Sequence, residues 1–340
     1  MLPDELREVP LRPTPHLVIL GAGASRAVSP DGEALGRTLP LTNELPSALD
    51  LEDLLDGSAM EDAGADFEAF FSSLAEAGES DLQDEIERRL YELFDGFAIA
   101  ESVTLYDRLV LSLRRKDLIA TFNWDPLLAY AYRRNGSLGT LPALAFLHGN
   151  VRLGVCLKDE RFGWNDDVCR VCDEPLAPSR LLYPVTNKDY SSDPVIAQQW
   201  KMMEWYLEGA YFLTIFGYSA PLTDVDARDR IVGAVQASDR KRFLQLEVID
   251  PAAEKLLHGN LAPLVEDGVH YSTGERLDHS WLARHPRLTC EALFQATMMQ
   301  EPIIPYRMPE TEDLSELQEW ARDFQDAFPE WLDEGYDGQG

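Results

Sequence analysis

Four short apolar runs in this chain lead into small or polar residues, and this repeated pattern limits the fold more than any other feature. They lie at 17–20, 117–125, 210–220 and 243–251, and they lead into GAGAS, TFNWD, GYSA and VID. Strands that are covered on both faces read as continuous apolar runs of this kind. Because ligands bind outside the carboxyl ends of the strands in open α/β sheets, the four endings are expected to line one crevice. The predicted fold class is α/β, with a doubly wound, Rossmann-like parallel sheet.

The segment between the first two runs, residues 44–115, has a helical pattern. DFEAFFSSLAEA and SDLQDEIERRLYELFDGF carry apolar residues at three- and four-residue spacing, and Ser80 and Asp81 are candidate N-caps. This segment is too long for a single crossover helix. A helical insertion is therefore expected there.

The rest of the chain divides near residue 290. We expect one main domain over 1–290, which includes a small cysteine-containing module at about 151–180 and a helix at 193–210. The module has no regular pattern. A C-terminal extension over 291–340 is expected to hold a helix at about 313–328, followed by a polar tail, DEGYDGQG, that frays.

The charge of the chain excludes some classes of function. Sixty acidic residues against thirty basic ones give a formal charge of −30, so direct nucleic-acid binding is not expected. No apolar run approaches the roughly 18 residues that a membrane helix needs. The first residues, MLPDELREVPLRPTP, lack the pattern of a signal peptide, so a cytoplasmic protein without membrane contact is expected. In that reducing compartment disulfides are not expected among the four cysteines, and the CxxC at 169–172 favours metal or redox chemistry.

The GAGAS turn is typical of phosphate binding. Gly21 and Gly23 allow a sharp turn and a close approach of an anion, and a helix that begins near Ser25 would point free N–H groups at a pyrophosphate. Arg26 replaces the third glycine of GxGxxG, and no ribose-binding acid follows about 20 residues later, which excludes a standard NAD dehydrogenase. Arg26 could clamp the pyrophosphate or be solvated. Taken alone, the turn could also form without a ligand.

The ordered set of motifs resembles the sirtuin family. It consists of GAGAS at 21–25, Thr121-x-Asn123-x-Asp125, His148-Gly149 and Gly217-x-Ser219, and it extends over roughly residues 15–252. In the form LHGN…YPVTNKDY…W…FGYSAPLTDVDA the chain is more similar to the bacterial sirtuin-like NAD-cleaving proteins of phage defence. Two departures from the family, a missing GIPDFR stretch and a missing segment for an acyl-lysine peptide, point away from protein deacylation. Phe122 replaces the glutamine of the family's TQN motif.

This resemblance implies a site for NAD+ and a role for each matching residue. His148 would be the general base toward a ribose hydroxyl or the incoming water. Asn123 would orient the ribose or the attacking water, although both residues could instead be ordinary loop residues. Asp125 would fix its own loop or contact the nicotinamide amide. The residues expected to bind the dinucleotide are Gly21, Ala22, Gly23, Ser25, Arg26, Thr121, Asp125, Gly217, Ser219 and Asp250.

Three cysteines, Cys156, Cys169 and Cys172, lie where sirtuins carry a four-cysteine zinc ribbon. Asp159 has the spacing to complete a tetrahedral site, as C-x-x-D followed by C-x-x-C. Cys290 is a distant alternative, and a ribbon that has lost its metal remains open. Zinc in this module would be structural.

Two acidic residues follow the GYSA ending. Asp224 and Asp226 could form a carboxylate pair or a metal site. The N-cap position of the next helix is the interpretation that we favour for Asp224.

The function implied by the resemblance is an NAD+ glycohydrolase that releases nicotinamide and ADP-ribose. It would be a restrained effector of anti-phage defence by abortive infection, activated by assembly into a homo-oligomer or by a separate ATPase or sensor protein. Two alternatives stay open. One is an NAD-dependent protein deacylase or ADP-ribosyltransferase, and the other is a non-catalytic sensor of ADP-ribose or NAD.

Overall fold

The computed structural model describes most of the 340-residue chain. The residues described are 6, 9, 11–30, 32, 36–183, 190, 193–221, 224–238, 244–265 and 269–328. The predicted polar tail at the C-terminus lies outside them. Among the described residues, no helix has both the length and the apolar character needed to span a membrane.

A six-stranded sheet forms the centre of the structure, and all of its strands run parallel. The strand order is β3-β2-β1-β7-β8-β9, which confirms the predicted fold class. Two strands, β3 and β9, escaped prediction, because β3 is a run of only four residues and β9 is a polar, largely exposed edge strand. The strands are β1 (His16–Leu20), β2 (Leu118–Thr121), β3 (Ala143–Phe146), β7 (Phe212–Phe216), β8 (Gln245–Ile249) and β9 (His270–Gly274).

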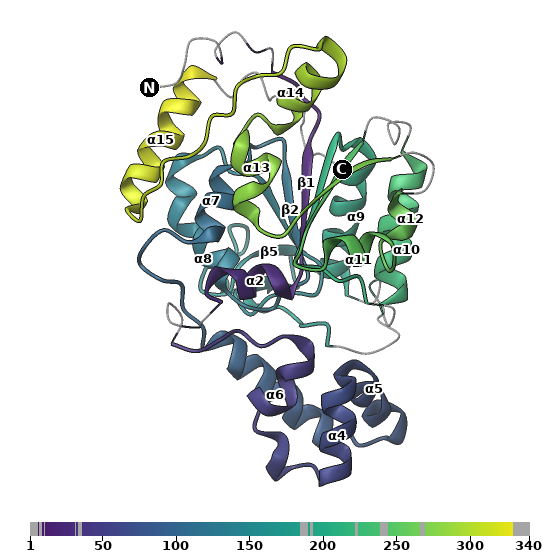
Figure 1. The fold of residues 1–340 in the computed structure, drawn as a ribbon. Coiled ribbons are helices and arrows are strands. Elements are labelled where there is room, and N and C mark those ends of the chain that lie inside the picture. Colours follow the sequence, from purple (N-terminus) through teal and green to yellow (C-terminus); the bar gives the residue numbers. More distant parts are fainter. Residues whose placement is uncertain are drawn as a thin grey trace.

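Helices cover both faces of this sheet, which is why its inner strands read as continuous apolar runs. On β1, Val18 and Leu20 belong to one core cluster, whereas Leu17 and Ile19 belong to the other. The first face is covered by α7 (Leu105–Leu111) and α8 (Leu127–Asn135). The second is covered by α9 (Pro194–Gly209), α10 (Val225–Ala237), α11 (Ala253–Leu257) and α12 (Ala262–Val265) (Figure 1).

A group of helices from the segment between β1 and β2 forms a lobe that stands apart from the sheet (Figure 1). Its elements are α3 (Leu45–Ala48), α4 (Gly57–Ala65), α5 (Phe67–Ala77) and α6 (Ser80–Asp95). Phe67, Phe71, Ile86 and Leu90 are buried in its interior. Glu79 holds the N-cap position of α6, one residue before the predicted caps. The last helix of this region, α7, packs against α8 on the sheet instead of joining the lobe.

The cysteine-containing module is more regular than its sequence suggests. It contains a small antiparallel sheet with the strand order β5-β4-β6. The strands are β4 (Leu153–Cys156), β5 (Arg161–Trp164) and β6 (Ala177–Pro178). Short strands with exposed β5 and β6 residues give no clear alternation, which is why the sequence predicted an irregular segment.

The C-terminal segment returns over the first face of the sheet. It includes α13 (Trp281–Arg284), α14 (Thr289–Phe294) and α15 (Leu314–Ala327). The last of these agrees with the predicted helix to within one residue at each end. The Gln318 amide donates to Arg134 O at 3.1 Å and to Asn135 Oδ1 at 3.0 Å. This segment is therefore tied to the end of α8.

Glu247 is a carboxyl group buried inside the sheet. It lies on β8, is 4% exposed, and accepts hydrogen bonds from Trp281 N at 3.0 Å and from Thr214 Oγ1 at 3.4 Å. Burial raises its pKa from the ordinary 4.5 to about 7. Between those values the unfolded chain gives up this proton before the folded chain does. The contribution of the neutral carboxyl to stability is therefore complete below pH 4.5 and is lost as the pH rises through about 7.

Replacing Glu247 by glutamine is expected to stabilise the protein at pH 8 and to have a much smaller effect at pH 5. Glutamine is neutral at both pH values and can still accept from Trp281 N. The gain in the free energy of unfolding at pH 8 is at most on the order of 3 kcal/mol. Melting temperatures at the two pH values measure it, with the exposed Glu61→Gln variant as a control. An equal effect at both pH values would contradict this account.

Candidate functional site

The turns that follow β1 and β7 interlock at the point where the strand order reverses. Gly21 N donates to Phe216 O and Gly23 N donates to Gly217 O, both at 3.0 Å. A Cβ atom on Gly21 would lie 2.5 Å from Gly217 O. Glycine is therefore required here for the contact between the two turns. This reversal of strand order is the place where α/β sheets open a crevice for a ligand.

Helix α2 (Ala22–Val28) begins directly after this turn, three residues earlier than predicted, with Gly21 at its N-cap position. Because Gly21 and Gly23 already donate to the β7 side, two of the N–H groups expected to meet a phosphate have partners in the protein. Ala22 is exposed at this turn.

Arg26 is directed toward Glu44. Its Nη1 donates to Glu44 Oε2 at 2.7 Å and to Leu39 O at 2.5 Å. The pKa of Glu44 is lowered, first by the backbone N–H of Leu41 and then by Arg26. Arg26 does not line the cavity described next. The structure therefore gives it a role in anchoring the segment around Leu39, in place of the predicted pyrophosphate clamp.

A cavity of about 660 Å³ lies between the carboxyl edge of the sheet and the helical lobe. Cavities of roughly 300–1,000 Å³ are the usual size for small-molecule sites. The lobe and the segment before it supply one wall, with residues 39–43, 45, 65–68 and 94. Most of the predicted site residues lie in this cavity, namely Gly21, Ala22, Gly23, Ser25, Asn123, Asp125, His148, Gly217, Ser219 and Asp250.

Asn123 joins the end of β2 to the first turn. Its amide nitrogen donates to Gly21 O at 2.8 Å and to Ser25 Oγ at 2.9 Å. The Ser25 hydroxyl also contacts the hydroxyl of the fully buried Tyr106 at 2.6 Å. These bonds hold Asn123 rigidly and leave its Oδ1 as the atom that it could offer to a ligand.

Two other residues of the TFNWD ending support this loop. Thr121 Oγ1 accepts from Asn123 N at 3.0 Å and does not line the cavity. Asp125 Oδ1 accepts from Leu127 N at 3.1 Å, at the start of α8. Burial raises the pKa of Asp125 to about 6, and a hydrogen bond with Ser25 opposes that rise. Thr121 therefore shapes the loop, and Asp125 both shapes it and lines the cavity.

His148 meets two partners that came from distant parts of the sequence. Its Nε2 lies 2.9 Å from Tyr190 Oη and 3.5 Å from Asp224 Oδ2. Tyr190 Oη in turn donates to Asp224 Oδ1 at 2.7 Å. Asp224 holds the N-cap position of α10, as predicted, but its side chain does not cap the helix. Its carboxylate faces Tyr190 and His148 instead.

An aromatic wall surrounds the imidazole. Phe122 stacks on Tyr218 with ring centres 4.3 Å apart and meets His148 edge-on at 4.8 Å. Tyr218 Oη and Trp124 Nε1 are buried, and neither has a hydrogen-bond partner among the described residues. Both residues line the cavity. A buried polar atom without a partner is costly, so these two atoms suit a ligand that carries hydrogen-bonding groups.

The β8 ending provides a carboxylate at the far side of the crevice. Asp250 Oδ1 accepts from Ala252 N at 2.8 Å, which shapes the turn into α11. On the β7 side, Ser219 is exposed and its carbonyl accepts from Asn260 Nδ2 at 2.9 Å. Both residues line the cavity, so a ligand that extends past the interlocked turns would reach them.

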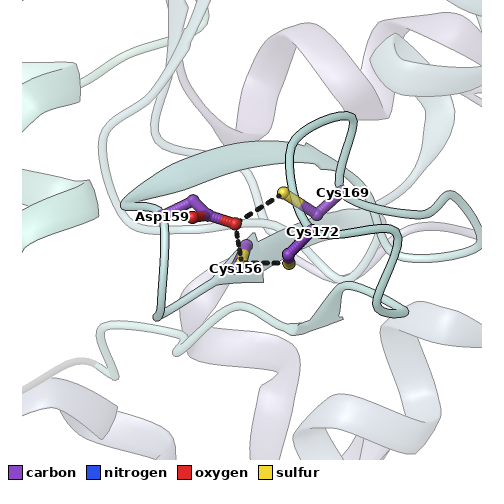
Figure 2. Close-up of side chains that lie close together, drawn as sticks. All are labelled: Cys156, Asp159, Cys169 and Cys172. Carbon is purple, nitrogen blue, oxygen red and sulfur yellow. Dashed lines mark hydrogen bonds between the residues drawn. The ribbon is translucent and has the colours of Figure 1, made fainter.

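The three cysteines and Asp159 of the module come together at one place (Figure 2). One ligand atom from each of Cys156, Asp159, Cys169 and Cys172 lies within 4.8 Å of all the others. Asp159 Oδ2 is 3.4 Å from Cys156 Sγ and 3.3 Å from Cys169 Sγ, and Cys156 Sγ is 3.6 Å from Cys172 Sγ. The fourth cysteine, Cys290, is buried against Phe212 and Leu293 and lies outside this cluster.

These distances fit a tetrahedral zinc site. Bonds of about 2.3 Å to sulfur and 2.0 Å to oxygen put two sulfur ligands about 3.8 Å apart and a sulfur and an oxygen about 3.5 Å apart. Backbone N–H groups of Cys172 and Val171 lower the pKa of the Cys169 thiol, whereas the contact with Asp159 raises the pKa of the Cys172 thiol to about 12. Metal binding would require Cys172 to lose its proton. All four positions are used by the protein, so zinc there would hold the module together and leave no position for substrate.

We expect the purified protein to contain about one zinc ion per chain, bound by these four residues. Cys172→Ser removes one of four ligands, so it should lower the zinc content to a small fraction and lower the melting temperature. Elemental analysis measures the first effect and a thermal melt the second. Cys290→Ser, outside the cluster, is the control for zinc content. Equal zinc content in both variants would rule out this ligand set.

Several residues that line the cavity or support it were not predicted as site residues. Glu68 lines the cavity from the helical lobe, whereas Tyr106 and Tyr190 are not part of its lining and act through their contacts with Ser25 and His148. Asp224 was considered as a helix cap, or with Asp226 as a carboxylate pair or metal site, and not as a partner of His148. The available signal was that Tyr190 and Asp224 each precede a helix on the same face of the sheet. Whether their side chains reach His148 depends on how α9 and α10 pack.

Comparisons with known proteins give weak matches. No protein-family model matches the chain, and no curated protein matches it. Among solved structures, a mutant Sir2 homologue in complex with ADP-ribose is 15% identical, with 74% of this chain and 85% of that chain covered and a TM-score of 0.34. Sir2 in complex with an inhibitor, 2′-O-acetyl-ADP-ribose and a deacetylated peptide is 14% identical, covering 92% and 93%, with a TM-score of 0.36. A Sir2 homologue in complex with NAD is 13% identical, covering 88% and 95%, with a TM-score of 0.34. These TM-scores are too low for a function to be inferred from the likeness, so the proposed function rests on the geometry of this chain.

Proposed function

We propose that this chain binds NAD+ in the cavity and cleaves the bond between nicotinamide and ribose. One observation supports this above all. The cavity brings together the GAGAS turn, Asn123, His148 and the GYS ending of β7, which the chain supplies from four separate segments. A glycine turn at the start of a helix can receive a pyrophosphate, and an imidazole near a ribose can take a proton from water.

The reaction breaks the bond between C1′ of the ribose and N1 of nicotinamide. Nicotinamide leaves as a neutral molecule with the bonding electron pair, and positive charge develops on the ribose as in glycoside cleavage. Water then forms a bond to C1′ and loses a proton to His148. The products are nicotinamide, ADP-ribose and one proton.

The charge of the cavity suits this transition state. The carboxyl-bearing residues that line it are Asp66, Glu68, Asp125, Asp224 and Asp250. Negative groups at fixed positions stabilise positive charge that develops on the ribose. The aromatic wall of Phe122 and Tyr218 limits bulk water on the His148 side. In this proposal the interlocked glycine turns receive the pyrophosphate at Ala22.

Restraint of this activity is part of the proposal. The lobe supplies a wall of the cavity, so a change in its position would change access to His148. Assembly into a homo-oligomer, or contact with a separate ATPase or sensor protein, would supply that change during phage infection. The protein would act in the cytoplasm.

A protein deacylase or ADP-ribosyltransferase is the second candidate, since it would break the same bond and use a protein as acceptor. The observation in its favour is a set of exposed apolar side chains on the cysteine module, which could meet a protein. They are Leu157, Phe162, Val168 and Val171.

Incubating the purified protein with NAD+ and separating the products by chromatography tests the proposal. A glycohydrolase releases nicotinamide and ADP-ribose in equal amounts without any added peptide. A deacylase releases nicotinamide only in step with a deacylated peptide product. If neither occurs, with or without candidate partners, and NAD+ still raises the melting temperature, the chain is a non-catalytic sensor.

A further inference from the structure

We propose that Tyr190 and Asp224 are positioning residues that keep a proton on Nε2 of His148 and stabilise the charged form of its imidazole. The reaction that His148 serves rests on the proposed function. The arrangement of the protons does not, and it can be measured without turnover.

The three side chains meet from three separate elements. His148 follows β3, Tyr190 precedes α9 and Asp224 precedes α10. Their exposed fractions are 7%, 2% and 3%, so water competes little for these contacts. The rings of His148 and Tyr190 lie nearly parallel, with an angle of 15° and centres 5.7 Å apart. The contact between His148 and Tyr190 therefore depends on the packing of side chains on the second face of the sheet.

The single proton of Tyr190 decides the direction of the bonds. A carboxylate has no proton to donate, so the 2.7 Å bond to Asp224 Oδ1 uses the Tyr190 proton. Burial, together with the charge of Asp224, raises the pKa of Tyr190 far above its ordinary value, so the proton stays on the hydroxyl. Tyr190 Oη can then only accept from His148, and Nε2 must carry the donated proton at 2.9 Å.

This bonding has two consequences for His148. The neutral imidazole is held as one tautomer, with its ring fixed by Nε2–H. When the imidazole takes up a second proton, Asp224 Oδ2 at 3.5 Å stabilises the resulting positive charge. An aspartate has the same two effects on the histidine of serine hydrolases. Here the Tyr190 hydroxyl forms a hydrogen bond both to the imidazole of His148 and to the carboxylate of Asp224.

Other charged groups face this trio. Glu68 from α5 acts on both Tyr190 and Tyr218, and Tyr218 lies at the end of β7. From α10, Arg228 acts on Tyr218, while the guanidinium of Arg230 lies 5.9 Å from the ring centre of Tyr190. Arg230 is also paired with Glu204 of α9 at 2.7 Å. Asp224 is the carboxylate in direct contact with both Tyr190 and His148, so its charge is the one to remove.

Nuclear magnetic resonance of protein labelled with ¹⁵N in the histidine rings tests this arrangement. The His148 signals are assigned from their loss in His148→Gln. We expect the Nε2–H tautomer in the neutral wild-type ring. In Asp224→Asn the midpoint of the His148 titration should fall by about one pH unit or more, because the positive ring loses its counter-charge. Tyr190→Phe should move the Nε2 signal, and Asp226→Asn, an exposed neighbour, should change neither.

Activity provides the second measurement if the wild type releases nicotinamide. Asp224→Asn should lower kcat by about tenfold to a hundredfold with little change in KM, and the acidic limb of its pH–rate profile should move to lower pH. A merely structural role would lower activity without moving that limb.

The outcomes separate the two proposals. A wild type that shows the expected tautomer and titration but no turnover contradicts the proposed glycohydrolase and keeps this inference. An Nδ1–H tautomer, or a His148 midpoint that is the same in Asp224→Asn and the wild type, overturns the inference even if the enzyme is active. Thermal melts of each variant establish that it is folded.

Discussion

His148→Ala is expected to lower nicotinamide release from NAD+ by about 10²–10⁴-fold and to leave ADP-ribose binding nearly unchanged. The imidazole is the group placed to take the proton of water, whereas the dinucleotide would be held mainly by the interlocked turns and by Asp250. Binding and chemistry should therefore separate in this variant. Chromatography of the products measures the rate, and isothermal titration with ADP-ribose measures the affinity.

His258→Ala is the matched control, since His258 is exposed and lies outside the cavity. It should keep full activity. Activity in His148→Ala that equals the wild type would remove His148 from the mechanism. A loss of ADP-ribose binding as large as the loss of rate would instead assign His148 to binding.

Gly217→Ala is expected to lower the melting temperature by on the order of 10 °C and to abolish ligand binding. Gly217 has a φ of 61°, and a Cβ atom there would lie 2.1 Å from Ala24 N. An alanine would carry the strain of the left-handed backbone and would push the β7 turn off α2. Because the same turn forms the floor of the cavity, stability and binding should fall together.

Gly233→Ala is the control for this substitution. Gly233 lies inside α10 with no atom within 4 Å of the position of an added Cβ, so alanine should be neutral or slightly stabilising. Thermal melts with and without ADP-ribose compare the two variants. A Gly217→Ala protein as stable as the wild type would show that the two turns can separate without cost.

The parts of this protein that the sequence predicts are those encoded by local patterns. The strand at His16–Leu20 was readable because both of its faces are buried, which makes the run from Leu17 to Leu20 continuously apolar. The helix Leu314–Ala327 was readable from its amphipathic spacing. β9 was missed because an edge strand such as HYSTG buries little and carries no such pattern.

The residues of the candidate site also divide into those whose place the sequence predicted and those whose place it did not. Asn123 and His148 stood in recognisable motifs at strand ends, and the structure places both in one cavity. Arg26 shows the opposite case, since its sequence position suggested a phosphate contact whereas its side chain reaches Glu44. A side chain as long as arginine has several partners within reach, and only the fold decides which one it meets.

The sequence by itself determined the parallel sheet, the glycine turn and the cysteine cluster, because apolar runs and residue spacing carry that information. The two residues at the centre of the proposed chemistry, Asn123 and His148, were picked out by the resemblance of the ordered motifs to a known family. The tertiary structure alone decided that Tyr190 and Asp224 meet His148 and that the helical lobe closes one side of the cavity. The contacts among His148, Tyr190 and Asp224 join residues at least 34 positions apart in the chain, and they form only when α9 and α10 pack on the sheet.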